Sequence, residues 1–151
     1  MTQRACFASP VGPLTLSEAG GCLTRLDWGG DPGPAPSPLL HAAGLQLAAY
    51  FAGELTRFDL PLDQGTGFAG QVRRAMAAIP YGETRRYGDL AGDLDASAQA
   101  VGQACGANPL PVLIPCHRVL GARGLGGYSG RGGVDTKVAL LRLERAAGLL
   151  I

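Results

Sequence analysis

Residues 29–38, GGDPGPAPSP, constrain the fold more than any other stretch of the chain. They hold four prolines and three glycines, so no regular helix or strand can pass through them. The preceding segment, CFASPVGPLTLSEAGGCLTRLDW, alternates apolar and turn-like residues and predicts a meander of hairpins. After the break, apolar residues recur at helical spacing and Gly53 offers a stop, which predicts one helix. The expected inner face of that helix is Leu39, Leu40, Ala43, Leu47, Tyr50 and Phe51.

A second break at residues 63–67 divides the chain into expected domains of residues 1–65 and 66–151. The second domain is predicted to be helical. Thr66 can cap a first helix that Pro80 ends, and its expected inner face is Phe68, Val72, Met76 and Ile79. Thr84 can cap a second helix, and Ser97 a third that ends before residues 108–109. The tight turn between the last two helices predicts a helix-turn-helix.

Composition and charge narrow the function classes. The chain is 46% hydrophobic and 17% charged, which is typical of a packed globular protein. Neither a run of ~20 apolar residues nor an apolar signal core is present, so we expect a cytoplasmic protein that does not associate with membranes. Residues 1–65 carry three Lys/Arg against six Asp/Glu (net −3), and residues 66–151 carry ten against six (net +4). This asymmetry favours a polyanionic partner for the second half, although a solvated surface gives similar counts.

The four cysteines are Cys6, Cys22, Cys105 and Cys116. A chain with a real core and no export signal more often keeps such thiols free than paired. The sequence contains neither the CxxC nor the HxxxH spacing that is typical of metal sites. Cys116 and His117 are adjacent, and adjacent residues chelate a metal poorly together. We therefore expect neither disulfides nor a metal site.

Two segments are unusually poor in large side chains. The predicted third helix, SAQAVGQACGA, is built mostly of alanine and glycine, which fits either a tightly packed buried helix or close approach to a narrow minor groove of ~6 Å. The loop GARGLGGYSGRGG holds seven glycines in residues 121–133. It is either a flexible connection or a backbone that lies against a flat ligand, with Tyr128 and Ser129 at its tip.

The stretch LIPCHRVLG, residues 113–121, interrupts an apolar run with Cys116, His117 and Arg118. In the closing helix, Glu144 shares a face with Leu140, Leu141 and Ala147, so its carboxylate is expected to need a partner. His117 is available, and a histidine held by a carboxylate can activate a thiol whose ordinary pKa is ~8.5. Neighbouring side chains diverge in extended backbone, so we expect a water molecule between the sulfur and the imidazole. A buried structural cysteine beside an incidental histidine is the alternative.

Several motifs together resemble the methylated-DNA–protein-cysteine methyltransferases, which repair O6-alkylguanine. The resemblance rests on SPVGPLTL, YFAGELTRFDLPL, IPYGETRRYGDLA, QAVGQACGANP, IPCHRV, GGYSG and LLRLE. It covers nearly the whole chain. It implies an α+β protein with a small N-terminal α/β, ribonuclease-H-like domain, followed by a mostly helical domain with a winged helix-turn-helix.

The resemblance also implies a reaction and the residues that carry it. Cys116 would take the alkyl group irreversibly from O6-alkylguanine, or from O4-alkylthymine, after the base is rotated out of the duplex. His117 would accept the thiol proton and Glu144 would orient its ring, while Asn108 would hold the turn that presents Cys116. Tyr87 would donate a hydrogen bond to the base, and the pocket would include Val119, Tyr128 and Ser129. The implied DNA-binding residues are Thr84, Arg85, Ala98, Gln99, Gly102 and Arg118.

The implied partner is double-stranded DNA, bound through the minor groove by a monomer that needs no cofactor. Two positions depart from the family pattern. Gln99 stands where an arginine usually fills the gap left by the extruded base, and Arg73 stands where a tryptophan is usual. Two further functions stay open at this point: a lesion-binding protein with weak or no repair activity, and a cysteine hydrolase that uses Cys116 and His117.

Overall fold

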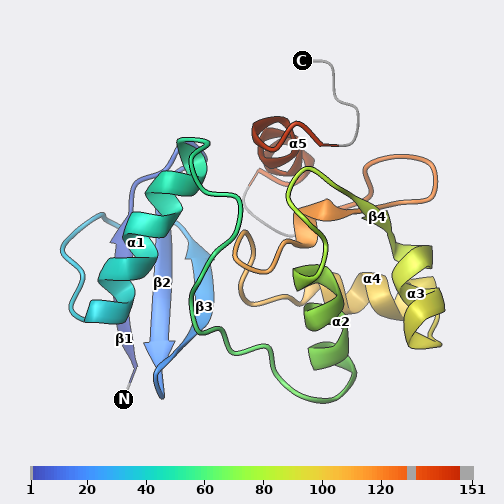
Figure 1. Cartoon of the computed structure of the whole chain (residues 1–151), viewed down its shortest axis with the longest axis horizontal. Helices are drawn as coiled ribbons and strands as arrows, with labels where there is room; N and C mark the ends of the chain where they lie inside the picture. The colour runs from blue at the N-terminus through green and yellow to red at the C-terminus, as the bar shows by residue number, and fades with distance from the viewer. Residues whose placement is uncertain (1, 129–131, 147–151) are drawn as a thin grey trace. The chain divides into compact units, whose positions relative to one another are not determined.

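A computed structural model describes residues 2–128 and 132–146 (Figure 1). The chain divides into two compact units, one ending at Asp63 and the other beginning at Gln64. The first unit carries the three-stranded sheet and the second carries most of the helices, so the molecule belongs to the α+β class. Among the described residues, no helix is long and apolar enough to cross a membrane.

The first unit is a three-stranded antiparallel sheet covered by one helix. Its elements are β1 (Gln3–Phe7), β2 (Leu14–Ala19), β3 (Cys22–Trp28) and α1 (Pro38–Phe51). The strand order is β1-β2-β3, which is the predicted meander. Ser37 begins α1 by accepting a hydrogen bond from the Leu40 backbone N–H at 3.1 Å. The helix packs on β1 and β2 so closely that a Cβ at Gly44 would lie 2.4 Å from the Phe7 ring.

The second unit surrounds a helix-turn-helix. Its elements are α2 (Gly67–Ala77), β4 (Arg85–Arg86), α3 (Tyr87–Leu94), α4 (Ala98–Gly106), η1 (Cys116–Arg118), β5 (Val119–Leu120) and α5 (Val134–Leu143). A left-handed Asp95 (φ 52°) makes the turn between α3 and α4, and Ser97 caps α4 through the Ala100 N–H at 3.0 Å, as predicted. The two-residue strands β4 and β5 pair in parallel, and α5 packs beside η1.

Three local predictions for this unit were wrong. Thr84 does not cap α3, because Arg85 and Arg86 pair with β5 and the helix begins only at Tyr87. The Asp89 carboxylate accepts the Arg86 backbone N–H at 2.9 Å at this end. Phe68, expected on the inner face of α2, is 38% exposed. The closing helix ends at Leu143, so Glu144 sits at its C-cap rather than within it.

Candidate active site and DNA-contacting helix

A short buried turn presents Cys116. The side chain of Asn108 holds both sides of the turn: its Nδ2 donates to the Ile114 carbonyl at 2.9 Å, and its Oδ1 accepts the Leu110 N–H at 3.1 Å. Val112 lies between them at a φ of 72°, a region that β-branched residues rarely adopt. Because these contacts over-determine the turn, the backbone that leads into Cys116 is rigid.

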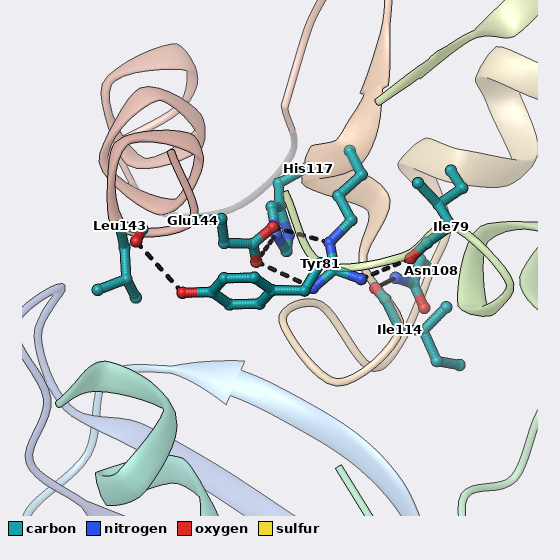
Figure 2. A network of polar contacts seen from close by, with 8 residues as sticks. Ile79, Tyr81, Asn108, Ile114, His117, Leu143 and Glu144 are labelled. Atoms are coloured by element: carbon teal, nitrogen blue, oxygen red, sulfur yellow. Dashed lines mark hydrogen bonds and ion pairs between the residues drawn. The ribbon is translucent and has the colours of Figure 1, made fainter. Parts of the chain in front are cut away.

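His117 and Glu144 meet in the protein interior (Figure 2). His117 Nε2 lies 2.7 Å from Glu144 Oε2, and both side chains are fully buried. Burial lowers the pKa of His117 below its ordinary value, and the Glu144 hydrogen bond opposes the shift only in part. The imidazole is therefore neutral near pH 7. Since an ionised carboxylate only accepts hydrogen bonds, the ring proton sits on Nε2 and Nδ1 keeps its lone pair.

The Nδ1 atom of His117 is buried and makes no hydrogen bond with any described residue. It is therefore the nitrogen that can accept a proton. The successive side chains of a 3-10 turn point about 120° apart, which lets Cys116 face a different partner from His117. Sequence reasoning had assumed extended backbone here, and the turn is the physical reason that the two side chains separate.

Arg118, which the resemblance assigned to DNA binding, is only 7% exposed. Its Nε donates to Glu144 Oε1 at 2.8 Å and its Nη2 to Glu144 Oε2 at 3.1 Å. Its Nη1 donates to the Ile79 carbonyl at 2.6 Å. The guanidinium is thus directed into the protein and away from any surface that DNA could reach. The prediction that Arg118 contacts DNA gains no support from this position.

Cys116 borders a cavity of about 410 Å³. The cavity is lined by Tyr87, Gly102, Cys105, Gly106, Cys116, Gly127 and Tyr128.

Burial raises the pKa of the Cys116 thiol, while side-chain hydrogen bonds from Asn108 and Tyr128 and the charge of Lys137 oppose the shift. A neutral thiol therefore predominates near pH 7, and a reaction at this sulfur requires a base. Burial also raises the pKa of Tyr87, so its hydroxyl remains a hydrogen-bond donor.

Lys137 is a site residue that the sequence reasoning missed. Its fully buried ammonium donates to the Val119 carbonyl at 2.6 Å and to the Gly127 carbonyl at 3.0 Å. Burial lowers its pKa to about 8. The signal was available, because Lys137 precedes Leu140, Leu141 and Glu144 by three, four and seven positions and so shares their helical face. Val119 thus reaches the site through its carbonyl, which already accepts one hydrogen bond.

Cys105 is the second residue that was missed, a buried thiol in the wall of the same cavity. Burial raises its pKa to about 12, so it stays protonated and is a poor nucleophile at neutral pH. Side-chain hydrogen bonds from Asn108 and Tyr128 favour the thiolate of Cys116, whereas the charge of Lys137 acts on both thiols. Within the described residues, no cluster of three His, Cys, Asp or Glu side chains could hold a metal ion.

The predicted DNA-contacting residues lie in two places. Ala98 and Gln99 are exposed at the start of α4, and Gly102 is half-buried one turn later. A Cβ at Gly102 or Gly106 would meet no atom within 4 Å, so the packing of the fold does not require these glycines. Close packing therefore does not explain why the exposed side of α4 carries glycine at these two positions.

The other predicted DNA-contacting residues, Thr84 and Arg85, lie before α3, where Arg85 Nη1 pairs with Asp93 at 2.7 Å. Ser129 lies outside the described residues.

A helix-turn-helix whose second helix is open and small-sided, together with a buried cysteine next to a histidine–carboxylate pair, indicates the class of DNA-binding proteins that carry a thiol for chemistry. Comparison with protein families supports this class. Residues 4–64 match the ribonuclease-like domain of 6-O-methylguanine DNA methyltransferase, and residues 67–146 match its DNA-binding domain. The chain belongs to the 6-O-methylguanine DNA methyltransferase family.

Individual relatives agree over nearly the whole chain. A methylated-DNA–protein-cysteine methyltransferase of Mycobacterium tuberculosis is 47% identical, with 91% of this chain and 89% of the relative covered. Another from Bacillus subtilis is 40% identical, with 91% and 92% covered. The crystal structure of the M. tuberculosis O6-methylguanine methyltransferase superposes with a TM-score of 0.82 at 46% identity, covering 96% and 93% of the two chains. A structure of M. tuberculosis OGT in complex with DNA gives 0.81 at 48% identity, covering 95% and 94%.

Proposed function

We propose that this chain repairs O6-alkylguanine in double-stranded DNA by moving the alkyl group irreversibly to the sulfur of its own Cys116. One observation carries the proposal: Cys116 borders a cavity while the neutral His117, held by Glu144, sits on the same turn. DNA repair by alkyl transfer is the function of the family to which the chain belongs. The proposal for this chain is that Cys116 is the acceptor sulfur and that His117, Glu144 and Tyr87 assist the transfer.

The chemical step is a displacement at the alkyl carbon. The base is rotated out of the duplex into the cavity, since its O6 substituent cannot reach a buried sulfur while stacked. An S–C bond forms as the C–O6 bond breaks, and the bond electrons leave with guanine, which becomes neutral by taking up a proton from water. The thiol proton passes through a water molecule to His117 Nδ1. Tyr87 donates a hydrogen bond to the base as negative charge develops on it.

The displacement needs a base that removes the thiol proton, and its product cannot return to a free thiol. Because burial raises the pKa of Cys116, the sulfur is protonated until His117 takes its proton. The neutral imidazole is ready to do so because burial also lowers its pKa. The product is a thioether, which has no good leaving group, so the sulfur is not regenerated.

DNA binding in this proposal uses α4 as the element that enters the minor groove. Gly102 and Gly106 have open space where a side chain would stand, which allows close approach of the helix backbone to the groove. Gln99 is exposed at the start of the helix, where it can occupy the space of the rotated base. Such binding requires one copy of the chain.

Peptide mass spectrometry after incubation with a duplex containing O6-methylguanine tests the proposal. We expect a mass gain of one methyl group on the peptide with Cys116, restored guanine in the DNA, and no gain in Cys116→Ser. Cys105→Ser, which removes the other cavity thiol, should still be methylated. An unmodified protein bound to the lesion would instead indicate a sensor, and continuous hydrolysis of a small ester would indicate a hydrolase. A duplex with O4-methylthymine extends the same measurement to the second substrate.

A further inference from the structure

Arg118 and Glu144 form a closed ion pair directly behind His117. The guanidinium contacts both carboxylate oxygens, at 2.8 and 3.1 Å, while one of those oxygens also lies 2.7 Å from His117 Nε2. The Arg118 side chain is 8% exposed and that of Glu144 is fully buried. Both members of this pair lose their hydration when they are buried, and the cost is offset only because their contacts are well formed. Removing one member would therefore leave the other as an uncompensated buried charge.

We propose that Arg118 is a positioning residue of alkyl transfer, which holds the Glu144 carboxylate against His117 and supplies the positive charge that the carboxylate needs. The proposal rests on the proposed function, in which His117 Nδ1 receives the proton of Cys116. It replaces the role in DNA binding that the resemblance implied for Arg118.

The reasoning follows the charge balance in the buried site. An isolated carboxylate in the interior is costly and would draw a counter-charge from the nearest group, which is the imidazole. A guanidinium does not lose its proton in proteins, so Arg118 provides that counter-charge at every accessible pH. His117 can then remain neutral and still be oriented by Glu144. Without Arg118, the Glu144–His117 pair would hold an additional proton at neutral pH, and Nδ1 would already be occupied.

Among the described residues, Lys137, Tyr81 and Cys116 are further titratable groups beside the site, and each acts in the same direction or remains neutral. Lys137 faces His117 from α5 and its charge further disfavours an imidazolium. Tyr81, from the segment between α2 and β4, lies against Arg118 with its ring centroid 5.8 Å from the guanidinium carbon. Burial and the charge of Glu144 raise the pKa of Tyr81, so it stays a neutral phenol. Cys116 is protonated before the reaction.

The pair is also anchored at both ends. Arg118 Nη1 donates to the Ile79 carbonyl at 2.6 Å, and the Tyr81 hydroxyl donates to the Leu143 carbonyl at 3.2 Å, one residue before Glu144 (Figure 2). These contacts fix the fork of the guanidinium relative to the carboxylate. A lysine at position 118 would keep the charge but could not make the planar, two-point contact.

The test compares Arg118→Met and Arg118→Lys with the wild type and with Arg142→Met, which removes an exposed arginine from α5. The first measurement is the single-turnover rate at saturating O6-methylguanine duplex between about pH 5.5 and pH 9.5, where a base near neutrality titrates. The second is the ¹⁵N chemical shift of the His117 ring in DNA-free protein over the same range. It reports tautomer and protonation without any reaction.

In Arg118→Met, we expect the midpoint of the His117 titration to rise above neutral pH, and the rate near neutral pH to fall severalfold because Nδ1 is then occupied. The rate should recover toward the wild-type value at alkaline pH. Arg118→Lys should show the same shift at smaller amplitude, and Arg142→Met none. If the Met variant does not fold, the upward shift in the Lys variant supports the proposal and its absence contradicts it.

Two results would overturn the proposal. A rate that falls equally at every pH, with an unchanged His117 titration, would mean that Arg118 only stabilises the fold. Weaker and more salt-sensitive DNA binding, with an unchanged rate at saturation, would restore the DNA contact. If the wild type transfers no alkyl group, the proposed function fails, but the ¹⁵N titration of the DNA-free variants still decides the role of Arg118.

Discussion

At the scale of single residues, the site depends on three consecutive residues of a 3-10 turn, Cys116, His117 and Arg118, whose side chains point in different directions. Cys116 borders the cavity, while His117 and Arg118 both reach Glu144. The pairing of His117 with Glu144 could be predicted, because an inward carboxylate needs a partner. Arg118 could not, because an arginine beside a DNA-binding motif reads as a surface cation. Its burial depends on the Ile79 carbonyl, 39 positions earlier in the chain.

Gln99 gives the first prediction at this scale. An arginine at this position would reach further into the gap left by the rotated base and add one positive charge. We expect Gln99→Arg to bind lesion duplex several-fold more tightly and to raise the repair rate at saturating DNA, measured by titration and by single-turnover kinetics. Because Gln99 is exposed on α4, the fold should be unaffected.

The matched control is Gln103→Arg, one turn further along the exposed side of α4. It adds the same charge and can strengthen binding through the phosphates, but it should leave the rate at saturation unchanged. Equal affinities and rates for Gln99→Arg and the wild type would remove the role assigned to position 99.

At the scale of secondary structure, periodicity and turn residues predicted the hairpin meander, α1 and the pair α3–α4. Of the three predicted caps, Thr66, Thr84 and Ser97, only Ser97 makes the expected side-chain hydrogen bond. The capping of α4 by Ser97 is a local hydrogen bond, which the sequence reveals. The start of α3 depends on β4 pairing with β5, more than thirty positions away, and so could not be read locally. The exposure of Phe68 could not be predicted from helical spacing either, because it depends on which distant segments pack against α2.

The glycine at the centre of α4 gives a prediction that separates folding from binding. A methyl group at Gly102 has free space in the protein, so Gly102→Ala should raise the free energy of unfolding by about 0.5–1 kcal/mol through helix propensity. The same methyl group would stand between the helix and the minor groove, and we expect at least about tenfold weaker DNA binding, since a lost close contact of 1.4 kcal/mol is a factor of ten. Urea unfolding and DNA titration measure the two effects.

Gly92→Ala on α3 is the control, because a Cβ there also meets no atom within 4 Å. It should stabilise the protein to a similar extent and leave DNA binding unchanged. Undiminished binding by Gly102→Ala would argue against α4 as the element in the groove.

At the scale of the whole molecule, the charge asymmetry and the two breaks indicated a helical second unit with a polyanionic partner. The cavity could not be predicted, since α3, α4 and the loop after β5 bring its walls together only in the folded chain. Cys105 was missed for that reason, because a cysteine on a helix gives no sign of the cavity that it lines. The burial of Lys137, in contrast, could have been predicted from the helical face that it shares with Leu140 and Leu141.

Global stability should depend on pH through His117. Its pKa is lowered in the folded state, so the unfolded chain binds more protons as the pH falls below about 6.5. The free energy of unfolding should therefore fall in acid, and the slope should be shallower in His117→Gln. The matched control is His41→Gln, which replaces an exposed histidine on α1. Urea unfolding at several pH values below 7 measures this, and equal slopes in wild type and His117→Gln would refute it.

The most direct test of the central claim, that one sulfur is consumed in one displacement, is the transfer stoichiometry with lesion duplex in excess. Labelled methyl groups bound to protein are counted over time at several ratios of DNA to protein. We predict a single burst that ends at one methyl group per chain, all of it on Cys116, with no slower phase. Continued repair beyond one equivalent, or a burst of equal size in Cys116→Ser, would contradict the claim.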